Sequence, residues 1–420
     1  MVGITARSSA AALLCAAVVF AAAAAGAQSA DGRVTAATET ATQPTTTATP
    51  PIRSRAQLDA WLRAHAGVPT PLNRMPAGAR MRFLASLQFG RNGLGGFGTE
   101  DLGATLTPAE IRAVLALFGP EVEEFAGHIA STRRPGAAPT STQATSDIER
   151  RFNELYFLNL ELATTTDAEH GEHLVSRYLA LFPQARDAAW LHATGDADLK
   201  LLYRAATLAN FYRADVAASS AMAAAIEELD ARAIAAPAEL QQARDALLSA
   251  RQFDAAHRFD ATHAAAGLTS LPAFRDIAAD FGGRPSLWRL NTAGDVLTRQ
   301  PVDTGPLQVM VLAGCHFAAD AASDIVADPV LGPVFRAHAR WLSLPPGQED
   351  TQALHDWNRA HPQAPMEMLY DRSEWPMFTH WRMPTFYVIR HGQVLGSLSG
   401  WSPSSRAELV TLLRRTGLLL

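Results

Sequence analysis

The sequence predicts a multidomain protein in which two all-α regions precede a C-terminal α/β domain. Between residues 52 and 281, apolar residues recur at the spacing of amphipathic helices, and serine or threonine caps stand before several of these segments. From residue 286 onward, short apolar runs rich in Val and Leu alternate with helical segments, which is typical of a mixed sheet covered by helices. Stretches rich in Thr, Ala and Pro separate the parts and indicate linkers.

The domain boundaries follow from these changes in composition. With 420 residues, 48% of them hydrophobic, the chain is long enough to build two or three cores. We expect a signal peptide at 1–27, a disordered linker at 28–51, a small helical domain at 52–131, a linker at 132–145, a helical domain at 146–283 and an α/β domain at 284–420.

The N-terminal segment predicts export to the periplasm. One positive charge, Arg7, precedes an apolar run at 10–25, and the Ala-Gly-Ala at 25–27 fits a cleavage site. Cleavage removes Cys15 and leaves Cys315 as the only cysteine, so the mature chain can form no internal disulfide. If Cys315 reacts in an oxidising compartment, an external thiol must reset it. We expect no membrane span after cleavage.

Charge and motif content exclude several functions. The formal net charge is −5, and −6 once Arg7 is removed, which argues against nucleic acid as a partner. Lys200 is the only lysine, so no Gly-Lys-Ser phosphate loop exists and a Schiff base would have to use Lys200. The Gly-Ser-Leu-Ser-Gly run at 396–400 has leucine where a serine hydrolase has its nucleophile.

The first helical domain is predicted from capping signals. Ser54 with Gln57, and Thr107 with Glu110, have the spacing of capping boxes. The glycine-rich run at 90–98 has no strand before it and no helix directly after it, so we interpret it as a flexible loop rather than a phosphate-binding loop. Helices are expected at 54–64, 79–88, 107–118 and 121–129.

The second helical domain contains further amphipathic segments, the first opened by Ser146 and Glu149. Their pairing is weakly similar to tetratricopeptide helix hairpins, although no 34-residue period recurs. We interpret the domain as a surface that docks a protein partner or presents a substrate. Helices are expected at 146–162, 169–182, 197–212, 217–229, 238–250, 253–263 and 271–281.

Two patterns in this domain have a functional and a structural interpretation. His170 and His173 are three residues apart on one helical face and could hold a metal, but they lack the spacing of zinc proteases, which favours a solvated face. Four aromatic residues could line a ligand site, but helical spacing favours core packing. They are Tyr156, Tyr203, Phe211 and Tyr212.

The α/β domain is predicted to be organised around the apolar strand that ends at a Gly-Cys turn, at 306–315. An Ala-rich helix follows, so Cys315 stands where a strand passes into a helix. A strand hairpin at 286–298 is expected to open the domain. The remaining elements are a helix at 318–335, a strand at 339–344, a helix at 351–360, and strands at 366–370, 386–389 and 393–398.

This order of elements, over 288–420, resembles the thioredoxin superfamily. In that family a cysteine at a strand end faces a loop with a cis proline, and the resemblance places Cys315 and Pro384 in these roles. It also implies that Met383 lies against the sulfur. The family motif is Cys-x-x-Cys, and here Ala318 replaces the second cysteine, so no resolving thiol is present. The helix and strand at 351–370 resemble the periplasmic cytochrome-maturation branch.

The expected chemistry is thiol–disulfide exchange or isomerisation by one cysteine, with no cofactor. Helix N-termini stabilise a thiolate and can lower its pKa from about 8.5 toward roughly 3.5–7.5. His316 could add positive charge or accept the proton, so Cys315 and His316 are the predicted catalytic residues. Met383, Pro384 and Thr385 are the predicted substrate-binding residues. Release of a mixed disulfide would need a protein thiol or a small thiol from outside the chain.

Two alternatives remain open from the sequence. A superfamily domain that has lost a cysteine can serve as a non-catalytic binding or assembly module, because a fold does not fix function. Cys315, His316 and Met383 are ligands that suit Cu(I), but the further cysteine of related copper chaperones is missing. No metal is therefore assigned to the site.

Overall fold

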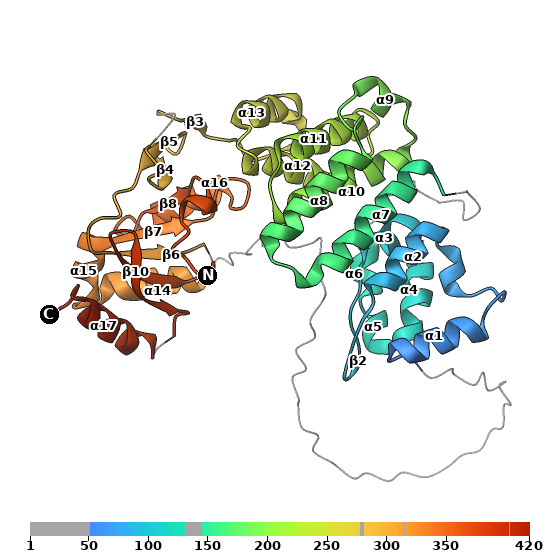
Figure 1. The fold of residues 1–420 in the computed structure, drawn as a ribbon, viewed down its shortest axis with the longest axis horizontal. Helices are drawn as coiled ribbons and strands as arrows, with labels where there is room; N and C mark the ends of the chain where they lie inside the picture. Colours follow the sequence, from blue (N-terminus) through green and yellow to red (C-terminus); the bar gives the residue numbers. More distant parts are fainter. Residues whose placement is uncertain (1–50, 132–144, 278–280, 315, 403) are drawn as a thin grey trace, which may run out of the picture. The chain divides into compact units, whose positions relative to one another are not determined.

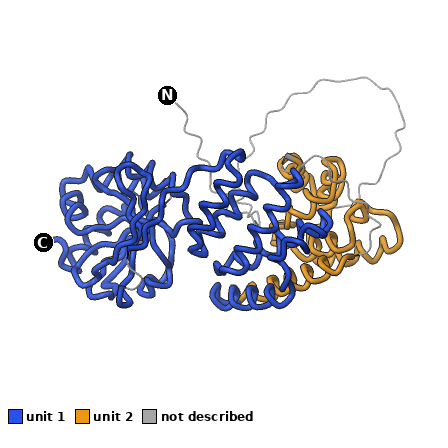
Figure 2. Tube along the Cα trace, turned by 90° about the horizontal axis from the view of Figure 1, so that it is seen from above, with its two compact units in different colours: residues 1–11, 165–420 blue, residues 12–164 orange. Residues whose placement is uncertain are grey.

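The computed structural model describes residues 51–420 except 132–144, 278–280, 315 and 403. The predicted signal peptide and both predicted linkers, apart from the last residue of each linker, lie outside the described residues, and so does Cys315. The rest forms two compact units, one ending at Thr164 and the other beginning at Thr165 (Figure 2). Among the described residues, no helix combines the length and the apolarity needed to cross a membrane.

The unit that ends at Thr164, unit 2 in Figure 2, is helical with one small hairpin. Its core contains Phe83, Phe97 and Phe118, which meet edge to face. The unit extends through Thr164, so the helix expected to open the second helical domain belongs to this unit instead. Its elements are α1 (Arg55–Ala64), η2 (Pro71–Arg74), α2 (Ala77–Ser86), β1 (Gln88–Gly90), β2 (Gly93–Gly96), α3 (Glu100–Thr105), α4 (Pro108–Leu115), η3 (Ala116–Phe118), α5 (Pro120–Glu123), α6 (Ala126–Ser131), α7 (Asp147–Glu161) and η4 (Leu162–Thr164).

The predicted caps of this unit are confirmed. Ser54 Oγ accepts a hydrogen bond from the Gln57 amide at 3.2 Å and begins α1. At the start of α4, Thr107 and Glu110 form the reciprocal capping box, with the Glu110 carboxylate accepting from the Thr107 amide at 2.9 Å. The helix predicted at 121–129 is instead two short helices, α5 and α6.

The glycine-rich run at 90–98 is not the loop that we expected. Most of it belongs to the antiparallel hairpin of β1 and β2, in which Gly90 pairs with Gly93. The sequence gives little sign of these strands because they are short and consist largely of glycine, which has a low strand propensity. Their pairing depends on the fold around them.

The unit that begins at Thr165, unit 1 in Figure 2, opens with a run of helices, and from α10 onward each packs against the next along the chain (Figure 1). Most of the predicted helices are present. The helix predicted at 271–281 is wrong, because Ala273–Arg275 forms a strand, β3, that pairs in parallel with β5 (Val296–Pro301). The helices are α8 (Asp167–Leu181), α9 (Ala188–Ala193), α10 (Asp196–Tyr212), α11 (Val216–Ala231), α12 (Pro237–Ser249), α13 (Phe253–Thr262) and η5 (Ala264–Ala266).

A mixed eight-stranded sheet follows, in the order β10-β9-β6-β7-β8-β4-β5-β3. The fully buried strand β6 (Gln308–Leu312) runs parallel to β7 and antiparallel to β9. The predicted opening hairpin is confirmed, with β4 antiparallel to β5. The other elements are β4 (Ser286–Leu290), α14 (His316–Ala327), α15 (Leu331–His338), β7 (Ala339–Ser343), α16 (Thr351–Ala360), β8 (Met366–Leu369), η6 (Arg372–Glu374), β9 (Thr385–Arg390), β10 (Gln393–Ser399) and α17 (Ser405–Thr416).

The two faces of the sheet have different covers. Val309 and Val311 of β6 face a core shared with α14, α15, α16 and α17. Met310 and Leu312 face the opposite side, where they pack with the aromatic residues of the segment 375–381. The alternation along β6 therefore gives the strand a core on both faces, which explains its unbroken apolar sequence.

The helix predicted at 318–335 is two helices, α14 and α15. Asp328 ends the first and caps the second, because its Oδ1 atom accepts hydrogen bonds from the amides of Val330 and Leu331 at 2.8 and 2.9 Å. Pro329 follows directly and disfavours a helical conformation for Asp328. The Arg406 side chain, hydrogen-bonded to Asp328, lowers the pKa of this carboxyl to about 2.

Candidate functional site

The predicted site lies at the carboxyl end of β6, and Gly314 marks its position. Gly314 is exposed and has a φ angle of +144°, which disfavours any side chain. A Cβ atom placed on Gly314 would lie 2.9 Å from Oε2 of Glu349 and 3.2 Å from Sδ of Met383. Cys315 lies outside the described residues, but its two chain neighbours, Gly314 and His316, are described. The structure thus brings Met383 to the residue before the cysteine.

The three predicted substrate-binding residues lie where the chain enters β9, Met383 and Pro384 directly before the strand and Thr385 as its first residue. The peptide bond between Met383 and Pro384 is cis, as the resemblance implied. The Thr385 hydroxyl donates to the carbonyl of Arg382 at 2.8 Å and lies 3.1 Å from the Ser399 hydroxyl. Pro384 and Thr385 are buried, and Met383 is half-buried. Of these three side chains, only that of Met383 is partly exposed and can contact a ligand.

His316 and Phe317, at the start of α14, are exposed. Their rings contact each other, with centroids 3.8 Å apart. Phe317 retains 54% of its accessible surface. The helix that follows Cys315 in the chain thus begins with two exposed rings, one of them apolar.

Glu349 is a site residue that the sequence reasoning missed. It precedes Asp350, the cap of α16, in the loop after β7. Burial and, to a smaller extent, the negative charge of Asp350 raise the pKa of Glu349 to about 7, although a hydrogen bond from the Asp350 amide acts to lower it. No sequence spacing links Glu349 to Cys315, so only the fold brings this carboxyl beside Gly314.

This arrangement can exchange a proton near neutral pH. A carboxyl with a pKa of about 7 can both donate and accept a proton there, whereas an ordinary glutamate is already ionised. Glu349 and the Met383 sulfur both lie close to Gly314, the residue that precedes Cys315 in the chain. Perturbed carboxyls of this kind are typical of functional sites.

The histidine pair and the aromatic residues noted in the second helical domain have different outcomes in the structure. His170 does not lie on a solvated face: it is buried and stacks on Tyr212 at 3.8 Å, and burial lowers its pKa. Tyr203 is buried as expected, whereas Phe211 is exposed. In the described part of the chain, no group of three His, Cys, Asp or Glu side chains is placed to hold a metal.

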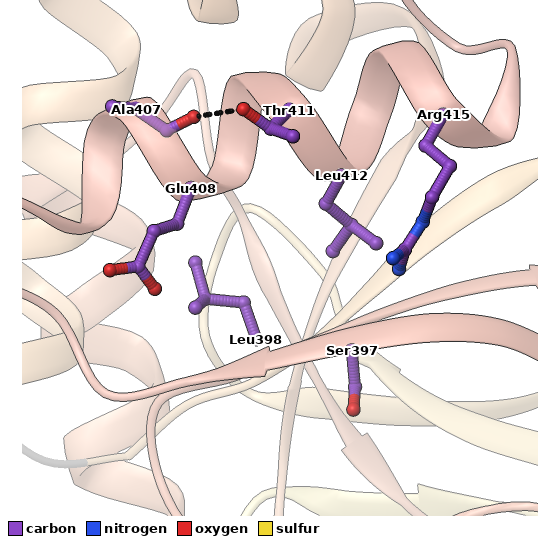
Figure 3. A pocket seen from close by; sticks show the side chains of 7 residues that line it. All are labelled: Ser397, Leu398, Ala407, Glu408, Thr411, Leu412 and Arg415. Atoms are coloured by element: carbon purple, nitrogen blue, oxygen red, sulfur yellow. Dashed lines mark hydrogen bonds between the residues drawn. The ribbon is translucent and has the colours of Figure 1, made fainter.

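A groove lies elsewhere in the α/β domain, between β10 and α17 (Figure 3). It has a volume of about 360 Å³ and includes Glu408 and Arg415 on the helix side. None of its lining residues belongs to the predicted site, so it lends no support to the chemistry at β6. Comparisons of the chain with family models, with curated proteins and with solved structures found no match.

The carboxyl beside Gly314 predicts a pH dependence of stability. The folded-state pKa of Glu349 is about 7, above the ordinary glutamate value of about 4.3. The folded protein therefore keeps a proton that the unfolded chain has released, so this contribution to stability is complete below about pH 4 and is lost as the pH rises through about 7. Its slope cannot exceed about 1.4 kcal/mol per pH unit.

Urea unfolding of wild type and Glu349→Gln, between about pH 5 and about pH 8, measures this dependence. We expect the glutamine variant to show a flatter decline of the free energy of unfolding with pH. Glu408→Gln, at an exposed position on α17, serves as the matched control. Equal slopes for wild type and Glu349→Gln would contradict the prediction.

Proposed function

We propose that this chain is an exported, thioredoxin-like protein that carries out thiol–disulfide exchange or isomerisation through Cys315. The observation that carries the proposal is the pair of groups at Gly314, the Met383 sulfur and the Glu349 carboxyl, beside the residue before the cysteine. The strand order also supports it, because β6 lies between β9 and β7 and leads directly into α14. Export and a periplasmic location are proposed from the sequence of residues 1–27.

The proposed reaction proceeds in two steps. The Cys315 thiolate attacks one sulfur of a substrate disulfide, which forms a mixed disulfide and releases the other sulfur as a thiolate. A second thiol, from the substrate or from a small molecule such as glutathione, then attacks the mixed disulfide and restores Cys315. Glu349 takes up the proton of the Cys315 thiol and returns it to the departing thiolate.

The alternative is a non-catalytic binding module in the cell envelope. Ala318 favours it, because this residue replaces the second cysteine of the motif and lies fully buried in the core of the α/β domain. The helical segment from α8 to α13 would then supply the surface for a protein partner. The exposed side chains Leu179, Phe211 and Val216 give this segment apolar contact area.

Alkylation of Cys315 against pH decides between the two functions. In a Cys15→Ser background Cys315 is the only thiol, and we expect half-maximal alkylation clearly below about pH 8.5, the value of a free cysteine. With reduced glutathione supplied as the second thiol, this protein should accelerate the reduction of a glutathionylated peptide, and its Cys315→Ser variant should not. A midpoint at or above that of free cysteine, together with no peptide reduction, would reject the redox proposal in favour of the binding module.

A further inference from the structure

The loop 345–350, between β7 and α16, contacts the helical segment directly. Gly347 has a φ angle of +89°, and a Cβ atom placed there would lie 2.2 Å from the carbonyl oxygen of Asp245 and 2.7 Å from the amide nitrogen of Ser249. Both residues belong to α12. The loop backbone therefore lies against the helix backbone at a distance that only glycine permits.

The same loop reaches Gly314 at its other end. Glu349 follows Gly347 by two residues, and its carboxyl oxygen is the one 2.9 Å from the Cβ position of Gly314. The loop between is a tight turn, since the amides of Gln348 and Glu349 both donate to the carbonyl of Pro345, at 3.0 and 3.1 Å. A displacement at Gly347 would therefore move Glu349.

Charged groups on both sides of this junction affect each other. On α12, the pKa of Asp245 is raised to about 7, chiefly by burial and further by the charges of Asp350 and Asp260, although the Arg244 guanidinium acts to lower it. Asp350, on the loop, also raises the pKa of Glu349. One loop carboxylate thus acts on a carboxyl of the helical segment and on the carboxyl at the site.

A second contact fixes the same helical corner to the sheet. Arg251, directly after α12, forms an ion pair with Asp371 at 2.9 Å, and its guanidinium lies over the Tyr370 ring. At the start of α13, Phe253 stacks on Phe274 of β3 with ring centroids 4.2 Å apart. The corner between α12 and α13 therefore has two points of attachment, one on each side of the turn.

We propose that the helical segment positions a residue of the site at the end of β6. Helix α12 holds the loop 345–350 in place and thereby fixes Glu349 against Gly314 and Met383. Gly347 is then a positioning residue, which acts on the site through Glu349. The inference goes beyond thiol chemistry, because it holds whether or not Cys315 reacts. It also gives a route by which a partner bound to the helical segment would change the site.

The test is the titration of the Glu349 carboxyl in the full chain carrying Cys315→Ser. Difference infrared or carboxyl ¹³C NMR spectra against Glu349→Gln identify its signal. Gly347→Ala should move the titration midpoint from about 7 toward the ordinary glutamate value of about 4.3. Gly417→Ala is the matched control, because Gly417 has a similar φ of +82° but no atom within 4 Å of its Cβ position.

A second variant alters the contact between α12 and the loop 345–350 from the side of the helix. The Ser249 hydroxyl lies 2.6 Å from the Cβ position of Gly347, so Ser249→Leu should push the loop away and move the Glu349 midpoint in the same direction. If either variant folds and leaves the midpoint where wild type has it, the inference is overturned. Because Cys315 is absent from all these chains, the outcome is separate from the test of thiol reactivity.

Discussion

Replacing Arg82 with alanine should destabilise the unit that ends at Thr164 by about 3–5 kcal/mol. The Arg82 side chain is only 2% exposed, and its guanidinium forms an ion pair with Asp101 at 2.7 Å and with Glu149 at 3.2 Å. It also donates to the Asn153 side chain at 2.6 Å. Removal leaves the two carboxylates without this cation, and breaking a buried ion pair by removing one partner costs more than the pair contributes.

Hydrogen exchange read by mass spectrometry, combined with urea unfolding, locates and measures this loss. Exchange should increase in α2, α3 and α7, which Arg82 connects, and stay unchanged in the sheet around β6. Arg112→Ala is the control, because the Arg112 side chain is 61% exposed and its ion pair with Glu123 spans 3.8 Å, so we expect a loss of at most about 1 kcal/mol. A similarly small loss for Arg82→Ala would contradict the prediction.

The Arg82 cluster shows where sequence reasoning stops. The caps at Ser54, Thr107 and Ser146 are local patterns, and each begins the helix that was expected of it. Arg82 and Glu149 are 67 residues apart, with a predicted linker between them. No local pattern assigns α7 to the earlier helices, because the ion pairs that attach it become visible only in the fold.

The α/β domain follows the same division between local and non-local signals. The strands β6, β9 and β10 and the helix α16 have clear local signals and are found where the sequence predicts them. The strand β3 has three residues and depends on pairing with β5, so its sequence was interpreted as a helix. The candidate site shows the same difference. Met383 was predicted from a family resemblance, whereas Glu349 is recognised as a site residue only when the position of the loop after β7 is known.

The second large effect is expected from Trp288→Ala, in β4. Trp288 is fully buried, and its ring meets those of Phe253 and Phe274 nearly at right angles, with centroids 5.3 and 5.5 Å away. Truncation of a buried tryptophan leaves a large cavity, so the unit 165–420 should lose about 3–5 kcal/mol of unfolding free energy. Phe253 belongs to α13, so the cavity opens at the attachment of the helical corner to the sheet.

The variant Trp288→Phe distinguishes the contribution of ring packing to stability from that of the indole N–H. The indole N–H of Trp288 is buried and has no hydrogen-bond partner in the described part of the chain. Phenylalanine removes that unsatisfied donor and keeps most of the aromatic contact, so we expect a loss below about 1.5 kcal/mol. Urea unfolding gives the two free energies, and hydrogen exchange of 237–262 should rise in the alanine variant alone. Equal exchange in both variants would show that Phe253 does not hold the helical corner through Trp288.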